Sequence, residues 1–160
     1  MAAFSAVLVS TLLIIYIWAV ERRLARFVIF ATIVSSVLTV AAFMAEEKIY
    51  IKIQPSLFNF CFSAVLLGGL LTGRTMMREF FKSQFDLPDW VWFQLSLRWG
   101  LFFALATIAN ELAWRGLSDD DWVSFRVLVM APATGVFMLA QLPITMRGLR
   151  EEAAAMRQAD

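Results

Sequence analysis

Charged, amide and tryptophan side chains gather in one segment, which lies between two long apolar stretches and reads NELAWRGLSDDDWVSFR from Asn110 to Arg126. Glu111 and Arg115 are four residues apart, so on a helix they share a face and can form an ion pair. Arg126 lies about one turn into the next apolar stretch, from which it could reach the same carboxylate. Charges beside so much apolar sequence need a partner or water, so this segment is the first candidate for a functional site. The candidate residues are Asn110, Glu111, Trp114, Arg115, Asp121, Trp122 and Arg126.

Two interpretations of this polar cluster remain open. In the first, its ion pairs staple the hairpin between the two apolar stretches, and Glu111→Ala destabilises the hairpin by leaving Arg126 unpaired. In the second, the cluster binds a lipid headgroup or a protein partner. Asp121 is expected to cap the helix that begins at Trp122, because a carboxylate is favourable at a helix amino end. Catalysis is not predicted, since the sequence has no recognisable nucleophile and base, phosphate loop or metal-binding motif.

The composition is that of a membrane protein. Of 160 residues, 61% are hydrophobic and 17% are charged, and the mean hydropathy is +0.72. Histidine is absent and Cys61 is the single cysteine, so we predict no metal, no cofactor and no intramolecular disulfide. A net charge of +1 with scattered arginines argues against nucleic acid. The expected partners are membrane lipids and other membrane proteins, and the oligomeric state stays open.

Five apolar stretches approach the length of about 20 residues that a helix needs to cross a bilayer core. We therefore predict an all-α, polytopic bundle of about five transmembrane helices, with one membrane domain over residues 1–147 and a cytoplasmic tail over 148–160. An interfacial amphipathic helix is predicted between the third and fourth spans, ending before Pro88, either as a connector or as a docking surface. Its apolar side holds Met76, Met77, Phe80, Phe81 and Phe85. The predicted spans are Phe4–Val20, Phe27–Met44, Leu57–Thr72, Phe93–Trp114 and Trp122–Thr145.

Basic residues in the loops predict the orientation. Three segments hold three lysines or arginines each, and the alternate loops hold three in total, namely Lys48, Lys52 and Arg115. The amino terminus is thus expected outside and the carboxyl terminus in the cytoplasm. Tryptophans favour the headgroup level, which predicts Trp18, Trp90 and Trp92 at the inner boundary and Trp114 and Trp122 at the outer one. Candidate contacts at the inner boundary are Arg98, Arg78 and Lys82.

Small residues and prolines predict two further features of the helices. Gly69 and Gly73 form a small-xxx-small pair, which favours close helix packing. Pro132 and Pro143 lie inside the fifth span, where each removes a backbone donor and favours a kink.

The segment LRWGLFFALATIANELAWRGLSDDDWVSFRV, with IKIQPS and AVLLGGLLTGR upstream, resembles the bacterial intracellular septation protein A family, also called YciB-like inner-membrane proteins. The family's Lys-x-Lys-Pro-Thr element is present here without its second lysine, as Lys52-Ile53-Gln54-Pro55-Ser56. The resemblance implies an inner-membrane protein connected with septation and envelope maintenance, with partners in the envelope machinery and no established catalytic activity. The residues that carry the family pattern are Asn110, Glu111, Trp114, Arg115, Trp122, Val123, Phe125 and Arg126.

Three hypotheses for the function follow. The first is a non-catalytic scaffold or accessory factor in envelope synthesis or septation. The second is a small transporter or lipid-handling protein, in which Arg98, Glu111 and Arg126 line one continuous polar path between helices. The third is a cofactor-free accessory subunit of a larger energy-transducing membrane complex.

Overall fold

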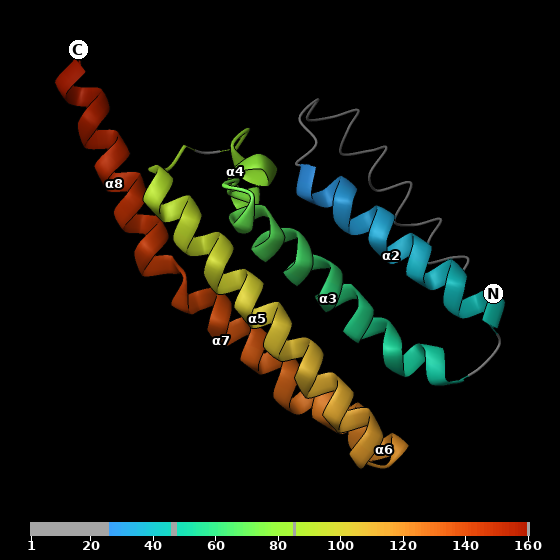
Figure 1. Cartoon of the computed structure of the whole chain (residues 1–160). Helices are drawn as coiled ribbons and strands as arrows, with labels where there is room; N and C mark the ends of the chain where they lie inside the picture. The colour runs from blue at the N-terminus through green and yellow to red at the C-terminus, as the bar shows by residue number, and fades with distance from the viewer. Residues whose placement is uncertain (1–25, 46–47, 85, 160) are drawn as a thin grey trace, which may run out of the picture.

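The computed structural model describes residues 26–45, 48–84 and 86–159, and over these residues the protein is an all-α bundle without strands (Figure 1). Three helical stretches have the length and composition of membrane spans, at Ile49–Leu71, Asp89–Gly116 and Asp119–Gln158, and a shorter apolar helix covers Ile29–Ala41. The predicted all-α, polytopic architecture is therefore confirmed. The predicted span Phe4–Val20, Trp18 and Phe85 lie outside the described residues. The elements are α2 (Arg26–Ala45), α3 (Lys48–Leu71), α4 (Met76–Phe81), α5 (Asp89–Gly116), α6 (Asp119–Phe125), the π-helix η1 (Arg126–Met130), α7 (Ala131–Ala140) and α8 (Leu142–Ala159).

The antiparallel helices α3 and α5 form the centre of the bundle (Figure 1). Helix α2 packs on α3, and the long stretch from α6 to α8 runs along the other side of α5. Aromatic rings join the layers, because Phe62 of α3 lies 5.0 Å from Phe30 of α2 and 5.3 Å from Phe103 of α5. On the far side of α5, Phe102 stacks on Phe137 of α7 at 4.2 Å. The rings thus form an apolar core that crosses the bundle from α2 to α7.

Helix α3 begins at Lys48, whereas the sequence pattern placed the start of this span at Leu57. The prediction of a loop at Lys48 and Lys52 is therefore wrong. The helix also contains Pro55, which cannot donate to the carbonyl four residues back. Such prolines are tolerated in membrane helices. The carbonyl that loses its regular donor is that of Ile51, and the neighbouring carbonyl of Lys52 accepts a hydrogen bond from Asn110 of α5.

Helix α4 forms in the segment where an interfacial helix is predicted, and it packs across the ends of α2, α3 and α5. Phe80 is buried and stacks on Phe30 at 5.5 Å, and the Met77 amide donates to Ser96 Oγ at 3.2 Å. The apolar side of α4 is thus covered largely by protein. Trp92 is only 1% exposed, in a cluster with Leu87, Val91 and Leu95, so it is a core residue, and its place at the inner boundary stays a prediction. Trp92 lies in the first turn of α5, and its side chain faces the core.

Gly69 and Gly73 end helix α3 rather than forming a helix-packing pair, so that interpretation is wrong. Gly73 has a φ of +73°, the left-handed conformation typical of the residue after a helix end. The Arg74 amide donates to Gly69 O and the Gly73 amide to Leu70 O, which is the Schellman pattern. A Cβ at Gly69 would clash with Met76 Cγ, so the absence of a side chain at Gly69 leaves room for Met76 where the chain turns into α4.

The last span is one nearly continuous helical stretch with an interruption near each proline. The Ala131 amide donates to the Arg126 carbonyl five residues back, which widens the helix into η1 immediately before Pro132. A second break falls at Gln141, two residues before Pro143. Both breaks agree with the predicted effect of the prolines, since each ring excludes the regular hydrogen bond.

Helix α8 continues past residue 147, where the predicted tail begins, and contacts the start of α5. Gly148 is buried, and a Cβ there would lie 2.8 Å from Val91 Cγ2. Trp90 Nε1 donates to Glu151 Oε2 at 3.1 Å, and Arg147 Nε donates to Glu151 Oε1 at 2.8 Å. The first turns of the predicted tail are therefore anchored to the bundle.

Candidate functional site

The side chain of Asn110 is the polar centre of the bundle, at the end where α5 and α6 meet. It is 3% exposed, and both halves of its amide are used. Its Nδ2 donates to Lys52 O at 2.9 Å and to Ser56 Oγ at 2.8 Å, and its Oδ1 accepts from Trp122 Nε1 at 3.2 Å. One side chain thus joins α3, α5 and α6, and a buried amide with all partners in place fixes their register.

Two further contacts connect α3 to the polar cluster. Lys52 Nζ forms an ion pair with Asp119, the first residue of α6. Thr107 Oγ1 lies 3.5 Å from Ser56 O. Lys52, Ser56 and Asp119 were not among the residues predicted for the site. Lys52 and Ser56 belong to the IKIQPS segment, and its resemblance to the family pattern is the sequence signal that could have identified them as site residues.

The predicted ion pair within α5 is confirmed, and the predicted pair between helices is not. Arg115 Nε and Nη2 donate to Glu111 Oε2 at 3.1 and 3.0 Å. Arg126 forms no ion pair with any described residue, and its guanidinium instead lies 5.1 Å from the centre of the Trp122 ring. Because α6 begins at Asp119, Arg126 falls two turns into the helix and turns away from Glu111 towards α3.

Glu111→Ala is therefore expected to cost little, about 0.5 kcal/mol, because Arg115 is 66% exposed and an exposed pair of this kind is weak. The free energies of unfolding of Glu111→Ala and Arg126→Ala should be additive in the double variant, since the two side chains share no contact. Unfolding of the detergent-solubilised protein measures this. A coupling energy of about 1 kcal/mol or more between the two substitutions would instead support the predicted ion pair between Glu111 and Arg126.

Ser118, and not Asp121, caps helix α6, so the predicted cap is one turn too late. Ser118 Oγ accepts from the Asp121 amide at 3.2 Å and donates to Asp121 Oδ2 at 2.7 Å. Asp121 is the third helical residue, as in a capping box. The helix starts at Asp119, three residues before Trp122, because the Ser118 side chain accepts a hydrogen bond from one of the backbone amides that are free at the start of a helix.

The two tryptophans of the cluster have different environments. Trp122 is buried and bonded to Asn110, so it is a core residue rather than a boundary anchor. Trp114 is partly buried beneath Arg115, whose guanidinium lies 4.6 Å from the ring centre. The Trp114 Nε1 atom is buried without an acceptor among the described residues.

The candidate residues at the other end of the bundle do not meet in one site. Arg78 pairs with Asp89 at 2.9 Å, and Lys82 pairs with Glu79 at 3.3 Å, all on exposed surface around α4. Arg98 lies on α5 and its Nη1 is 3.5 Å from Gln141 Oε1. Within the described residues no contact joins Arg98 to Arg78 or Lys82.

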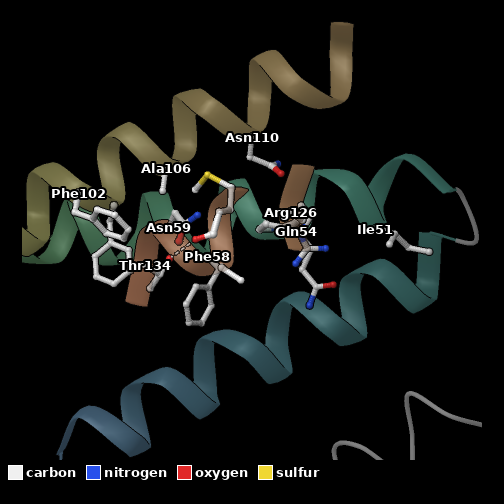
Figure 2. Close-up of a pocket in the computed structure, with 13 residues that line it drawn as sticks. Ile51, Gln54, Phe58, Asn59, Phe102, Ala106, Asn110, Arg126 and Thr134 are labelled. Carbon is white, nitrogen blue, oxygen red and sulfur yellow. Dashed lines mark hydrogen bonds between the residues drawn. The ribbon is translucent and has the colours of Figure 1, made fainter. Parts of the chain in front are cut away.

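A cavity of about 540 Å³ lies between α3, α5, η1 and α7, next to Asn110 (Figure 2). Figure 2 shows Arg126 and Gln54 near one end of it and Phe102 with Thr134 towards the other. Neither Arg98 nor Glu111 lines this cavity. The apolar rings of Trp99 and Phe102, on the same helix as Arg98, pack against Phe137 at 4.9 and 4.2 Å. The continuous path required by the transporter hypothesis is therefore absent from the described residues. The cavity is lined by Ile51, Gln54, Pro55, Phe58, Asn59, Phe102, Phe103, Ala106, Asn110, Arg126, Met130, Ala131 and Thr134.

Comparison with known proteins relates this arrangement to a family. The sequence matches the family described as intracellular septation protein A over residues 1–152. The chain belongs to the intracellular septation protein A family. A relative from Rhizobium meliloti (strain 1021), named inner membrane-spanning protein YciB, is 35% identical over 155 residues, or 97% of this chain. Relatives of the same name from Sinorhizobium fredii and Brucella melitensis biotype 1 are 36% and 39% identical over 86% and 79% of this chain.

The chain spans 64 to 71% of the length of these three relatives. No solved structure matches it. Membership of the septation protein A family, together with the apolar helices, identifies a multi-pass protein of the inner membrane. Two segments carry the family pattern, IKIQPS on α3 and the polar cluster from Asn110 to Arg126. They contact each other through the hydrogen bonds of Asn110 to Lys52 and Ser56 and through the ion pair of Lys52 with Asp119.

Proposed function

We propose that this member of the septation protein A family is a non-catalytic scaffold or accessory factor, which binds other proteins of the inner membrane during septation and envelope maintenance. The supporting observation is the exposure of its last span. In the most apolar window of Asp119–Gln158 only 6% of the residues are buried, compared with 28% and 33% in the spans of α3 and α5. A span with so few contacts in its own bundle leaves a long face for a neighbouring protein.

The outward face of η1 and α7 is the proposed docking surface. It consists of large apolar side chains that are more than half exposed and can pack against another helix. The described chain offers no catalytic constellation at this face, so binding is the activity that the geometry supports. The residues of the face are Val127, Leu128, Val136 and Leu139.

A photoreactive amino acid placed at Leu128 or Val136 in living cells tests this proposal. We expect protein adducts from both positions, and mass spectrometry should identify them as inner-membrane proteins of septation or envelope synthesis. Leu105 is the matched control, because it is as exposed as Val136, 66% compared with 67%, but lies on a different helix, α5. Equal adducts from all three positions, or none, would refute a specific surface. Adducts to subunits of an energy-transducing complex would instead support the third hypothesis.

We also propose that the α5–α6 hairpin lies in the periplasm and the α4 end in the cytoplasm. Arg74, Arg78 and Arg147 all lie at the α4 end of the bundle, as the positive-inside rule requires. In a Cys61→Ser background, a membrane-impermeant thiol reagent added to intact spheroplasts should label Ser118→Cys and leave Gln84→Cys unlabelled. The reverse labelling pattern would invert the orientation.

A further inference from the structure

The cavity beside Asn110 is a consequence of how the last span is held against α5. Contacts hold it at two levels, through the hydrogen bond from Trp122 to Asn110 and through the stacked rings of Phe102 and Phe137. Small residues line the cavity from both helices, namely Ala106 of α5 and Ala131 of α7. Two large contacts with small residues between them leave a gap that the chain does not fill. Its volume of about 540 Å³ is in the range of ligand pockets.

Arg126 supplies the only charge among the residues that line this cavity. No acidic side chain in the described part of the chain pairs with it, and its described contact is the Trp122 ring. The other polar groups of the wall are neutral and mostly engaged, because Asn110 uses its whole amide and Gln54 Nε2 donates to Thr39 Oγ1 at 3.3 Å. A guanidinium beside an apolar cavity in a membrane helix requires an anion or water.

With the start of α6 taken at the membrane surface, the side chain of Arg126 is within reach of the lipid phosphates. It lies seven residues after Asp119, the first residue of α6, which corresponds to about 10 Å along the helix. The headgroup layer on each side of a bilayer is about 5–8 Å thick, so the long side chain of Arg126 reaches this layer from the edge of the hydrocarbon. Thr134, two turns further along, lies at the depth of acyl chains.

The cavity is open to the surrounding membrane on the side of the last span. Arg126, Ala131 and Thr134 line it and are all exposed. Most of the opposite wall is apolar, including Ile51, Phe58 and other aromatic or aliphatic side chains from α3 and α5. A ligand that enters therefore meets a cation at one end and mainly apolar side chains along the rest, with the neutral polar groups of Asn59 and Thr134 among them (Figure 2).

We infer that this cavity binds a phospholipid from the leaflet on the α5–α6 side, with the lipid phosphate on Arg126 and one acyl chain between α3, α5 and α7. The planar guanidinium fork suits two phosphate oxygens at once. The lipid fills the gap that the small residues leave, and it supplies the anion that the described chain does not. The cavity lining does not include Val127, Leu128, Val136 or Leu139, the residues of the proposed docking surface.

Native mass spectrometry of the full chain, titrated with phosphatidylglycerol in a mild detergent, tests the inference. We expect Arg126→Gln to weaken binding about tenfold through loss of charged hydrogen bonds, and Arg126→Lys to weaken it less because the charge remains. Arg115→Gln is the matched control, since Arg115 is paired with Glu111 and does not line the cavity. An unchanged affinity in Arg126→Gln, or an equal loss in Arg115→Gln, would overturn the site.

A second pair of variants tests the acyl-chain part of the cavity. Ala131→Leu should weaken phosphatidylglycerol binding severalfold by filling the space, whereas Ala133→Leu should not, because Ala133 is exposed and outside the lining. Inorganic phosphate and glycerol phosphate should fail to displace the lipid at equal concentration. Displacement by either of them would show an anion site without a lipid and refute the inference.

The wild-type protein alone provides an independent test that no folding defect of a variant can affect. Phosphatidylglycerol should raise its unfolding temperature more than phosphatidylcholine does, since a ligand that binds the folded state stabilises it. The headgroup charge is the difference between the two lipids, and Arg126 is the group that faces it. Equal stabilisation by the two lipids would contradict a role for an anionic headgroup.

Discussion

Replacing Asn110 with leucine should lower the free energy of unfolding by about 2–3 kcal/mol. The change keeps the side-chain volume but removes both donors to α3 and the acceptor of Trp122 Nε1. The Trp122 indole, which is 5% exposed, then loses its acceptor in a buried position, and that cost adds to the loss of the hydrogen bonds to α3. Equilibrium unfolding in mixed micelles measures the difference.

Asn59→Leu is the matched control, because Asn59 lies on α3 one turn from Ser56 and has no hydrogen bond with another described side chain. It should change the stability by less than about 0.5 kcal/mol. A double-variant cycle with Trp122→Phe should give a coupling energy of about 1 kcal/mol with Asn110→Leu. If the two substitutions are additive, or if Asn59→Leu costs as much as Asn110→Leu, the three-helix junction is not what stabilises this end of the bundle.

The sequence predicts well those features that depend on local periodicity and composition. Long apolar runs require helices in a membrane, so the all-α class and the α3, α5 and last spans follow from hydropathy alone. The pair of Glu111 and Arg115 follows from a spacing of four on one helix. Both inferences use only neighbours along the chain, and both are confirmed.

Features that depend on how two helices face each other could not be predicted in this way. Asn110 and Arg126 both belong to the predicted cluster, but the rotation of α6 decides which of them meets which partner. That rotation follows from the cap at Ser118, which starts the helix three residues earlier than expected and turns Arg126 away from Glu111. The start of α3 was misplaced for a related reason, because Lys52 finds its partner, Asp119, far along the chain.

The cavity was also beyond sequence reasoning. Small residues, Ala106 and Ala131, line it from two helices, and hydropathy does not distinguish an alanine beside a cavity from an alanine in a packed contact. Similarly, the glycines that form a recognisable pair, Gly69 and Gly73, lie where α3 ends and the chain turns into α4, whereas the close contact between α3 and α5 is at an isolated Gly100. Close packing is a property of two surfaces, so a motif on one of them is insufficient.

Gly100→Ile should destabilise the protein by about 3 kcal/mol, through overpacking at the contact between α3 and α5. A Cβ at Gly100 would lie 2.6 Å from Leu67 Cδ2 and 3.3 Å from Leu66 Cβ, and Leu66 is only 1% exposed. Leu67 can change its rotamer, but Leu66 is held by the core, so the helices must separate. Separation also lengthens the hydrogen bond from Ser63 Oγ to Gly100 O, now 3.0 Å.

Gly135→Ile is the control for the effect of the substitution itself, because Gly135 also lies within a helix and a Cβ there meets nothing within 4 Å. Both variants gain helix propensity over glycine, by about 0.5 kcal/mol, so the difference between them isolates the packing at Gly100. Thermal unfolding in one detergent should place Gly100→Ile well below the wild type and Gly135→Ile close to it. Gly100→Ala should be intermediate, since Leu67 alone can accommodate a single methyl group. Equal unfolding temperatures for Gly100→Ile and Gly135→Ile would mean that α3 and α5 do not pack as closely as the distances at Gly100 indicate.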